Sequence, residues 1–511
     1  MMRQYLEILT VTISLISCLV WTYCRTEEIT HNIFTMVCIL AFLLTSAALE
    51  LSGSLKLKTK KFRQEDNGGF WCCLVLPFVF ILQQARTSPA SRESVLAKAT
   101  ESFVILSAGI AIRKAMISST KRTVLGQFVA TMALLLVLLS YRFTVLYIVP
   151  ASLVYSLLLY KLPDWFPKSF TFGEAAVTSQ LLSLPIHVAY MALILGEDLV
   201  FSNDSSRVSV IIHIGIVTAT AAFIVLDRWK FQSEWFYVSY AVTGFFLVLP
   251  CLCILLKQNP VYWIISRVTQ SKYTMILFLW WCFCTLVSVL LVNHYGNRNQ
   301  SSNKKIVSTV TRKLFHVIVI VVFVPGILLD PDFLFLSSVI ATAVLIVIEV
   351  IRLYRVPPFG TSLHQQYQVF VDKQDSGDLI LTPIYLLVGS SLSLWLTPSS
   401  GHDCKILSSF AGIISLGVGD MAASIGGKMC GQHKWPGTKK TVEGTLCAFF
   451  AQLVTIPVLH CLGASGAVLD IRIVFATLSV SCLEAFTQQI DNLILPIFAF
   501  VLFESVNLRK F

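Results

Sequence analysis

The chain has 511 residues, of which 56% are hydrophobic and only 13% are charged, and its mean hydropathy is +0.75. Soluble globular proteins carry about 25% charged residues, so this chain lacks the polar surface needed to cover a water-soluble core. The composition excludes an ordinary soluble enzyme, a disordered chain and a disulfide scaffold, and it predicts a polytopic membrane protein. We assign the net charge of +11 to cytosolic loops, and no basic helix outside the apolar segments indicates nucleic-acid binding.

Apolar segments long enough to cross a bilayer follow one another along the chain. A spanning helix needs about 20 residues, and this criterion predicts an all-α polytopic membrane protein with about 15–17 transmembrane helices. The clearer predicted spans are 5–24, 33–53, 124–141, 143–160, 175–196, 207–226, 236–256, 274–293, 314–329, 333–351, 379–396, 407–427, 445–462, 468–486 and 492–506. Two weaker candidates are 70–84 and 99–115.

Charge alternates between the loops that join these spans. If all the predicted spans exist, the loops rich in Lys and Arg fall on one side, which the positive-inside rule assigns to the cytosol. These loops are 54–69, 113–122, 294–313 and 428–444. The acidic loop 197–206, which contains the sequon Asn203-Asp-Ser, falls on the luminal side, whereas the sequon at Asn299 falls on the cytosolic side.

The chain changes character near residue 300. Residues 1–300 predict an N-terminal multi-span membrane region, and residues 301–511 predict a C-terminal catalytic helical bundle, because Gly, Asp, Lys and Pro concentrate there in motif-like stretches. The first stretches are Arg312-Lys-Leu-Phe-His316 at the mouth of a span, the pair Glu349 and Arg352, and the segment 370–378. Positive-inside anchoring and an i, i+3 ion pair are the simpler interpretations of the first two.

The segment 416–428 combines an aspartate with many small residues at the end of a predicted span. Asp420 and Ser424 are four residues apart and share one helix face. Gly419, Ala423 and Gly426 form a surface that another backbone or a ligand can approach closely. An ionised Asp inside a span is costly, so we interpret Asp420 as a metal ligand; a structural ion pair with a lysine is the alternative.

The following loop, 428–444, has the residues that a nucleotide triphosphate needs. Lys428, Lys434, Lys439 and Lys440 provide positive charge, and Trp435-Pro-Gly-Thr438 predicts a fixed turn instead of a freely solvated loop. Together with a carboxylate that binds a hard cation, such a loop suits a Mg²⁺–nucleotide complex. The loop lacks the Walker A pattern. The segment from Glu484 to Asp491 adds two acids between the last two spans, where a polar turn is the simpler interpretation.

The stretch from Gly419 to Gly444 resembles the signature of eukaryotic dolichol kinases, a family of CTP-dependent polyprenol kinases. Supporting elements are Arg312–His316, Phe370–Asp372, Asp378–Leu387 and Asp491–Pro496, so the motifs extend over roughly residues 308–505. The Lys439-Lys440-Thr441-x-Glu443-Gly444 element is also shared with CTP-dependent diacylglycerol and phytol kinases and with phosphatidate cytidylyltransferases.

The resemblance implies a lipid kinase of the endoplasmic reticulum membrane that transfers the γ-phosphate of CTP to the terminal hydroxyl of dolichol, giving dolichyl phosphate for protein glycosylation. It implies a cytosolic CTP site in loop 428–444, because the polyprenol cannot leave the bilayer and CTP cannot enter it. The implied CTP-binding residues are Lys428, Gly431, Lys434, Trp435, Pro436, Gly437, Thr438, Lys439, Lys440, Thr441, Glu443 and Gly444.

The expected catalytic residues are Asp420, Glu443, Asp491, His316 and Asp372. We expect Asp420 to hold Mg²⁺ with help from Glu443 or Asp491. Asp491, Asp372 or His316 is expected to position the lipid hydroxyl or accept its proton, and the sequence leaves this choice open.

Other functions remain as alternatives. A CTP-dependent kinase of diacylglycerol or phytol would share the loop, but such enzymes are shorter. A phosphatidate cytidylyltransferase is disfavoured because its closing Lys-Asp and Pro-Gly-His-Gly-Gly elements are missing. An anion transporter is disfavoured because the polar residues cluster on one predicted face and no paired discontinuous helices occur in corresponding halves.

Overall fold

In a computed structural model of the chain, the described secondary-structure elements are all helices, joined by loops. The described residues are 2–23, 39–48, 50, 61–63, 68–84, 93–118, 145–201, 203–228, 235–301, 309–367, 371, 375, 377–397, 405–465 and 470–507. Within these ranges the only extended pairings are two isolated bridges, Ile406 with Ser465 and Lys434 with Thr441. The predicted all-α class is confirmed.

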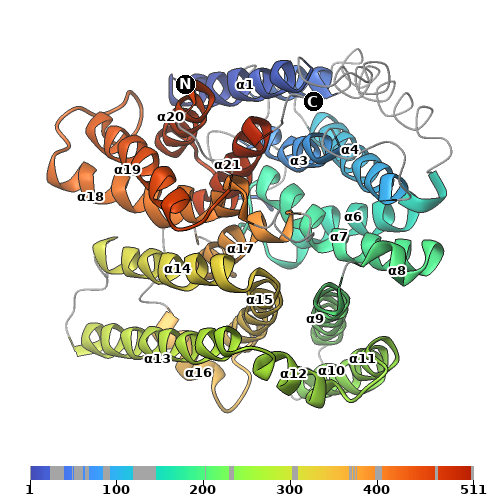
Figure 1. Cartoon of the computed structure of the whole chain (residues 1–511). Helices are drawn as coiled ribbons and strands as arrows, with labels where there is room; N and C mark the ends of the chain where they lie inside the picture. Colours follow the sequence, from blue (N-terminus) through green and yellow to red (C-terminus); the bar gives the residue numbers. More distant parts are fainter. Residues whose placement is uncertain are drawn as a thin grey trace. The chain divides into compact units, whose positions relative to one another are not determined.

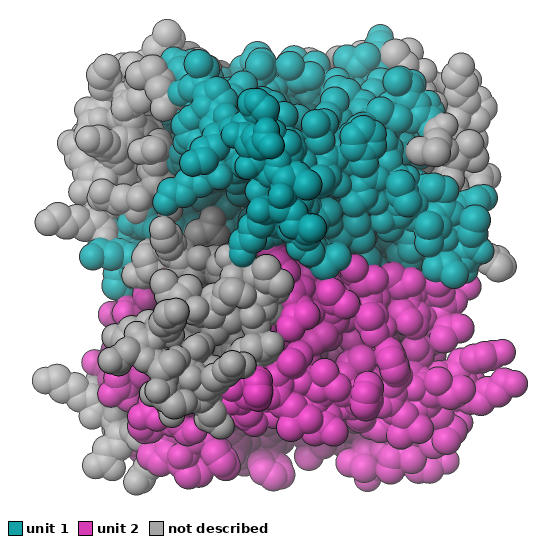
Figure 2. Space-filling model, turned by 90° about the vertical axis from the view of Figure 1, so that its left-hand side faces the viewer, with its two compact units in different colours: residues 1–200, 406–511 teal, residues 201–405 magenta. Residues whose placement is uncertain are grey.

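The described chain packs into two compact units, which Figure 2 colours separately. Unit 1 consists of residues 1–200 and 406–511, and unit 2 consists of residues 201–405. The two ends of the chain therefore belong to one packed body. The predicted division near residue 300 rests on chemical character instead of packing, and it stays a prediction about where the chemistry lies.

Unit 1 contains helices from both ends of the chain (Figure 1). Its elements are α1 (Met2–Tyr23), η1 (Phe70–Leu74), α3 (Val75–Gln84), α4 (Glu93–Ser118), α6 (Val145–Trp165), α7 (Phe172–Leu195), α8 (Glu197–Val200), η4 (Leu407–Phe410), η5 (Ile413–Asp420), α18 (Met421–Met429), α19 (Val442–Cys461), α20 (Ile471–Phe486) and α21 (Asp491–Asn507).

Helix α21 is the core of unit 1. Its side chains from Asn492 to Val506 are buried on every face, as expected for a helix that is apolar all round. It packs against α3, α20, η4, η5 and α1. Figure 1 shows α1 in blue beside α20 and α21 in red, so the first helix lies directly against the last two.

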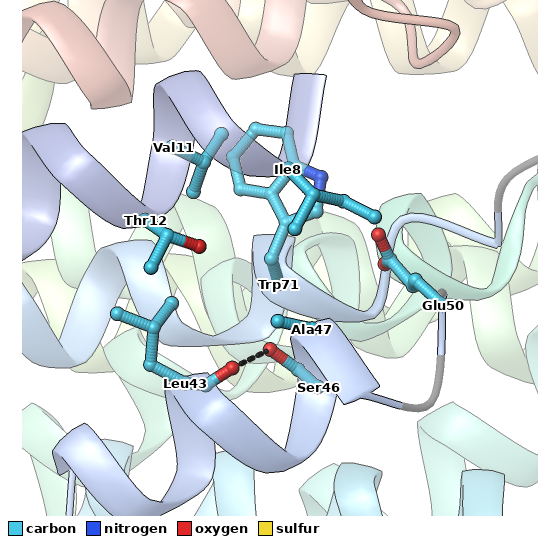
Figure 3. Close-up of a pocket in the computed structure, with 8 residues that line it drawn as sticks. All are labelled: Ile8, Val11, Thr12, Leu43, Ser46, Ala47, Glu50 and Trp71. Carbon is cyan, nitrogen blue, oxygen red and sulfur yellow. Dashed lines mark hydrogen bonds between the residues drawn. The ribbon is translucent and has the colours of Figure 1, made fainter. Parts of the chain in front are cut away.

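A pocket between α1 and the short helix 39–48 lies beside this packing (Figure 3). Its lining residues are Ile8, Val11, Thr12, Leu43, Ser46, Ala47, Glu50 and Trp71. Glu50 Oε1 accepts a hydrogen bond from the backbone N–H of Phe70 at 2.5 Å. The indole of Trp71 donates to Glu7 Oε1 at 3.3 Å. These two hydrogen bonds connect η1 to Glu50 and to α1.

Unit 2 is formed by the middle of the chain. Its elements are α9 (Asp204–Arg228), α10 (Trp235–Thr243), η2 (Gly244–Val248), α11 (Leu249–Leu256), α12 (Pro260–Thr269), α13 (Lys272–Ser301), α14 (Thr309–Leu329), α15 (Pro331–Leu353), α16 (Gly360–Tyr367) and α17 (Thr382–Trp395). Helix α15 packs against α9, α14, α16 and α17.

Nine described helices are long and apolar enough to cross a membrane. They are Met2–Tyr23, Val95–Met116, Leu146–Trp165, Phe172–Leu195, Asp204–Arg228, Trp235–Leu256, Lys272–His294, Pro331–Leu353 and Val442–Cys461. Shorter apolar helices occupy Ile39–Ala48, Phe70–Gln83 and Lys313–Leu329, where further spans were predicted. The predicted spans 379–396, 468–486 and 492–506 correspond to α17, α20 and α21, which are shorter than the bilayer criterion. The predicted span 407–427 corresponds to the consecutive elements η4, η5 and α18, and 124–141 lies outside the described residues. The protein is polytopic.

Candidate active site

Asp420 lies at a break in helical geometry. The segment η5, Ile413–Asp420, is a π-helix that continues directly into the α-helix α18. A π-helical turn carries an extra residue and is frequent at functional sites, because it turns a side chain away from the regular helical face. Asp420 is 4% exposed, so its carboxylate lies inside unit 1 and not on its surface.

Three carboxylates from three different elements converge in unit 1. Asp420 ends η5, Glu484 lies in the last turn of α20, and Asp491 begins α21. One oxygen from each lies within 4.8 Å of the other two. Asp420 and Glu484 are buried, whereas the side chain of Asp491 is 26% exposed and forms the open edge of the cluster.

Lys440 is the cation closest to these acids among the described ion pairs. Its Nζ lies 2.6 Å from Glu484 Oε1 and 3.8 Å from Asp491 Oδ2, and it also donates to the backbone oxygen of Glu484 at 2.5 Å. Burial alone lowers the pKa of Lys440, but the negative charges of Glu484, Asp491 and Asp420 outweigh it and raise that pKa above its ordinary value. Lys440 is therefore fully charged and bound to the acid cluster.

The loop between α18 and α19 is fixed by its own hydrogen bonds. The backbone N–H of Thr438 donates to the oxygen of Trp435 at 3.1 Å, and Gly437 has φ +73°, which defines a turn with Pro436 and Gly437 at its centre. Pro at the second position and Gly at the third are the residues that a type II turn requires. The backbone N–H of Trp435 donates to Lys440 at 3.0 Å and closes a small hairpin. The predicted fixed turn is present.

The indole of Trp435 attaches this hairpin to α19 and α20. Its Nε1 donates to Thr445 Oγ1 at 2.9 Å. Its ring meets the ring of Phe486 edge-on, with centroids 5.1 Å apart. Phe486 follows Glu484 by two residues at the end of α20, so the same side chain orients the loop that carries Lys440 and the helix that carries Glu484.

Close helix packing brings the loop's two supporting helices together. A Cβ on Gly426 would lie 2.4 Å from Cys447 Sγ, and a Cβ on Gly444 would lie 2.8 Å from the backbone oxygen of Ala423. Neither position has room for a side chain. The small-residue surface expected around Asp420 therefore packs against α19.

Glu443 has a different place from the one expected. Its carboxylate accepts hydrogen bonds from the backbone N–H of His433 at 3.1 Å and from His433 Nδ1 at 2.6 Å. It closes the base of the loop, because the hairpin turns it toward His433. The structure brings Glu484 together with Asp420 and Asp491, whereas Glu443 is not part of this cluster. The expected metal ligands Asp420, Glu443 and Asp491 stay a prediction.

The other expected residues fall into two groups. Lys428, Lys434 and Lys439 are exposed around the loop, where a solvent-borne phosphate can reach them. His316 is buried in α14 of unit 2, and it is not part of the three-acid cluster. Asp372 lies outside the described residues.

The pair Glu349 and Arg352 forms the ion pair that its spacing predicts. Arg352 Nη2 lies 2.7 Å from Glu349 Oε1, and both side chains are buried in unit 2. Arg352 also donates to the oxygen of Asp378 at 2.7 Å, and Glu349 accepts from the N–H of Ile380 at 2.6 Å. The pair therefore holds the segment that leads into α17.

The acid cluster fits a magnesium ion. Its three ligands are carboxylate oxygens, with no thiol or imidazole among them, and hard oxygen donors suit Mg²⁺. Lys440 supplies one positive charge against three negative ones, so the cluster keeps a net negative charge that a divalent cation neutralises. Glu484 was visible in the sequence as a charge within an apolar run, but its role depends on a contact between separate helices.

Fold and site together define a polytopic membrane protein with a carboxylate–lysine site within a helical unit. A sequence model of the dolichol kinase family matches residues 142–407. The dolichol kinase of Bos taurus is 35% identical over 358 residues, which cover 66% of this chain and 65% of that protein. The dolichol kinase of Saccharomyces cerevisiae is 30% identical over 260 residues, which cover 49% of this chain and 46% of its own.

This chain belongs to the dolichol kinase family, because the family model matches more than half of it. The match with the cattle and human proteins spans 65% of their length. The family match ends before Asp420, so the acid cluster and the loop lie outside the matched residues. No solved structure matches the chain.

Proposed function

We propose that this protein is a dolichol kinase, which transfers the γ-phosphate of CTP to the terminal hydroxyl of dolichol and releases CDP and dolichyl phosphate. Its place in the dolichol kinase family supports the lipid substrate. The observation that carries the reaction type is the cluster of Asp420, Glu484 and Asp491 beside Lys440 and a rigid, lysine-rich loop. Phosphoryl transfer needs little covalent help from protein; it needs positioning and neutralisation of charge, and this site has the residues for both.

In this proposal Asp420, Glu484 and Asp491 hold Mg²⁺, which supplies positive charge against the phosphate oxygens of CTP. Lys434 and Lys439 neutralise the triphosphate from the exposed loop. Lys440 holds two of the acids in place through its contacts with Glu484 and Asp491. Asp491 accepts the proton of the lipid hydroxyl, because it is the acid at the open edge of the cluster.

We further propose that the site faces the cytosol on the endoplasmic reticulum. The hairpin with Lys440 contacts Glu484 at the end of α20. Ile490, in the turn that follows, is linked through Glu174 to Arg63, a basic residue of loop 54–69. Two loops that charge alternation assigns to the cytosol are thus linked to the same turn between α20 and α21. Water-soluble CTP reaches these loops, while the apolar helices keep the isoprenoid chain in the bilayer.

The decisive experiment is an activity matrix on the purified full-length protein. Four acceptors (dolichol, a shorter polyprenol, diacylglycerol and phytol) are each combined with CTP, ATP, GTP and UTP in the presence of Mg²⁺. We expect phosphorylation of dolichol with CTP to exceed all other combinations. Preference for diacylglycerol or phytol would replace the acceptor, and release of pyrophosphate with a CDP-lipid product would show nucleotidyl transfer and overturn the proposal.

A further inference from the structure

The turn between α20 and α21, residues 487–490, connects two of the three acids. Glu484 stands two residues before the end of α20, and Asp491 is the first residue of α21. The positions of both carboxylates relative to Asp420 therefore depend on the conformation of this turn. The contacts that hold it come from the N-terminal part of the chain, which carries none of the sequence motifs.

Arg3 of α1 holds the beginning of the turn. Its Nε donates to the backbone oxygen of Phe486 at 2.9 Å, and its Nη2 donates to the oxygen of Thr487 at 2.5 Å. The last carbonyls of a helix have no partner within the helix, and a basic side chain can satisfy them. A Cβ on Gly437 would lie 3.4 Å from the Cβ of Arg3, so Arg3 also adjoins the turn of the lysine-rich loop.

Glu174 of α7 holds the end of the turn. Its Oε1 accepts a hydrogen bond from the backbone N–H of Ile490 at 2.8 Å and lies 2.5 Å from Nη2 of Arg63. Its Oε2 accepts from the N–H of Thr171 at 3.0 Å, which closes the capping box of α7. Glu174 is completely buried, and a buried charge persists only when it is paired and hydrogen-bonded in this way.

A third contact joins the middle of the turn to the same framework. Thr171 Oγ1 donates a hydrogen bond to Oε1 of the buried Gln489. A Cβ on Gly69, which has φ +68°, would lie 2.5 Å from the side-chain amide of Gln489. The turn is therefore enclosed by residues from three N-terminal segments, and its backbone is held at both ends by charged side chains.

We propose that Arg3 and Glu174 are positioning residues for the metal site: they fix the turn so that Glu484 and Asp491 meet Asp420 at ligand distance. This inference rests on the proposed metal-dependent kinase function. It gives the N-terminal part of unit 1 a direct task in assembling the site, in addition to spanning the membrane. Groups that orient metal ligands typically change metal affinity by about 10- to 100-fold when they are removed.

The first test uses the Arg3→Gln variant, because Arg3 is half-buried and its loss leaves no buried charge behind. Direct Mn²⁺ binding to purified full-length protein is measured by electron paramagnetic resonance, and kinase activity is measured over a Mn²⁺ titration. We expect binding to weaken by about tenfold, with the same shift in the Mn²⁺ concentration for half-maximal rate. Arg472→Gln is the matched control, since Arg472 pairs with Asp470 at the opposite end of α20 and should bind Mn²⁺ like the wild type.

The second test removes the oxygen acceptors that Glu174 offers to the N–H groups of Ile490 and Thr171, without leaving an unpaired buried charge. In one double variant Arg63→Gln is combined with Glu174→Gln, which keeps a carbonyl acceptor. In the other Arg63→Gln is combined with Glu174→Leu, which has similar size and no acceptor. We expect the Leu variant to bind Mn²⁺ about tenfold more weakly than the Gln variant.

Wild-type Mn²⁺ affinity in the folded Arg3→Gln protein, accompanied by a lower melting temperature, would mean that these contacts only stabilise the fold and would overturn the proposal. Equal Mn²⁺ affinity in the two double variants would overturn the part assigned to Glu174. If the Leu variant yields no folded protein, Arg3→Gln decides the question. A wild-type protein that binds Mn²⁺ but phosphorylates no lipid alcohol would overturn the proposed function and leave the positioning role intact.

Discussion

The Asp420→Asn substitution tests the metal site most directly, because it keeps size and hydrogen bonding and removes one negative charge. The three carboxylates lie within 4.8 Å of one another. At this separation and an effective dielectric constant near 20, two like charges repel by roughly 3 kcal/mol. Lys440 offsets only part of this repulsion, since it pairs with Glu484 and Asp491. Removal of the Asp420 charge should therefore leave the metal-free protein as stable as before, or more stable.

Activity should change in the opposite direction. Loss of one preorganised electrostatic contact typically costs ~10²–10³ in rate, or about 2.7–4 kcal/mol. We expect that loss in phosphorylation of dolichol by CTP, measured per folded protein over a Mg²⁺ titration. The melting temperature in EDTA should not fall, and its increase on adding Mg²⁺ should shrink. Full activity at ordinary Mg²⁺, or a lower melting temperature with unchanged specific activity, would refute the assignment and make Asp420 a structural residue.

Three further predictions follow from the site. Glu484→Gln should lower kcat by about 10²-fold whereas Glu443→Gln should lower it by less than tenfold, because only Glu484 belongs to the acid cluster; equal losses would contradict this distinction. Gly437→Ala should lower kcat/KM for CTP by about tenfold, since a left-handed residue with a Cβ costs about 1–2 kcal/mol, and an unchanged value would show that the turn does not shape the CTP site. Exposed Cys430 should react with a membrane-impermeant maleimide added to intact microsomes, and Cys430→Ser should remove that signal; protection of Cys430 would place the loop on the luminal side.

Much of the fold could be predicted from the sequence, because a strongly apolar composition indicates that most of the helices lie in a lipid bilayer. Apolar runs such as those of α9 and α15 must lie in a bilayer, since no water-soluble core could take them all. Short apolar helices that are surrounded by protein instead of lipid are harder to predict. Helix α21 is only 17 residues long and is buried on all sides by other helices, and nothing local distinguishes such a core helix from one that faces lipid.

The candidate site was predictable to the extent that its chemistry is local. Asp420 is conspicuous because a carboxylate within an apolar run is costly, and the turn at Pro436 and Gly437 follows from the φ angles these residues favour. Lys440 was expected to contact phosphate from solvent. That role stays a prediction, and the structure adds a contact with the acid cluster, because the hairpin folds back and brings the Lys440 side chain to α20.

The sequence by itself determined the class of protein, the costly aspartate and the rigid lysine-rich loop, because each follows from interactions between near neighbours or with the solvent. Only the tertiary structure decided that Glu484 and not Glu443 completes the acid cluster, although Glu443 is closer to Asp420 along the chain. The physical reason is that carboxylates are brought together by helix packing, which ignores sequence separation. The same packing places Arg3 beside Phe486, 483 positions away, and so joins α1 to the turn between α20 and α21.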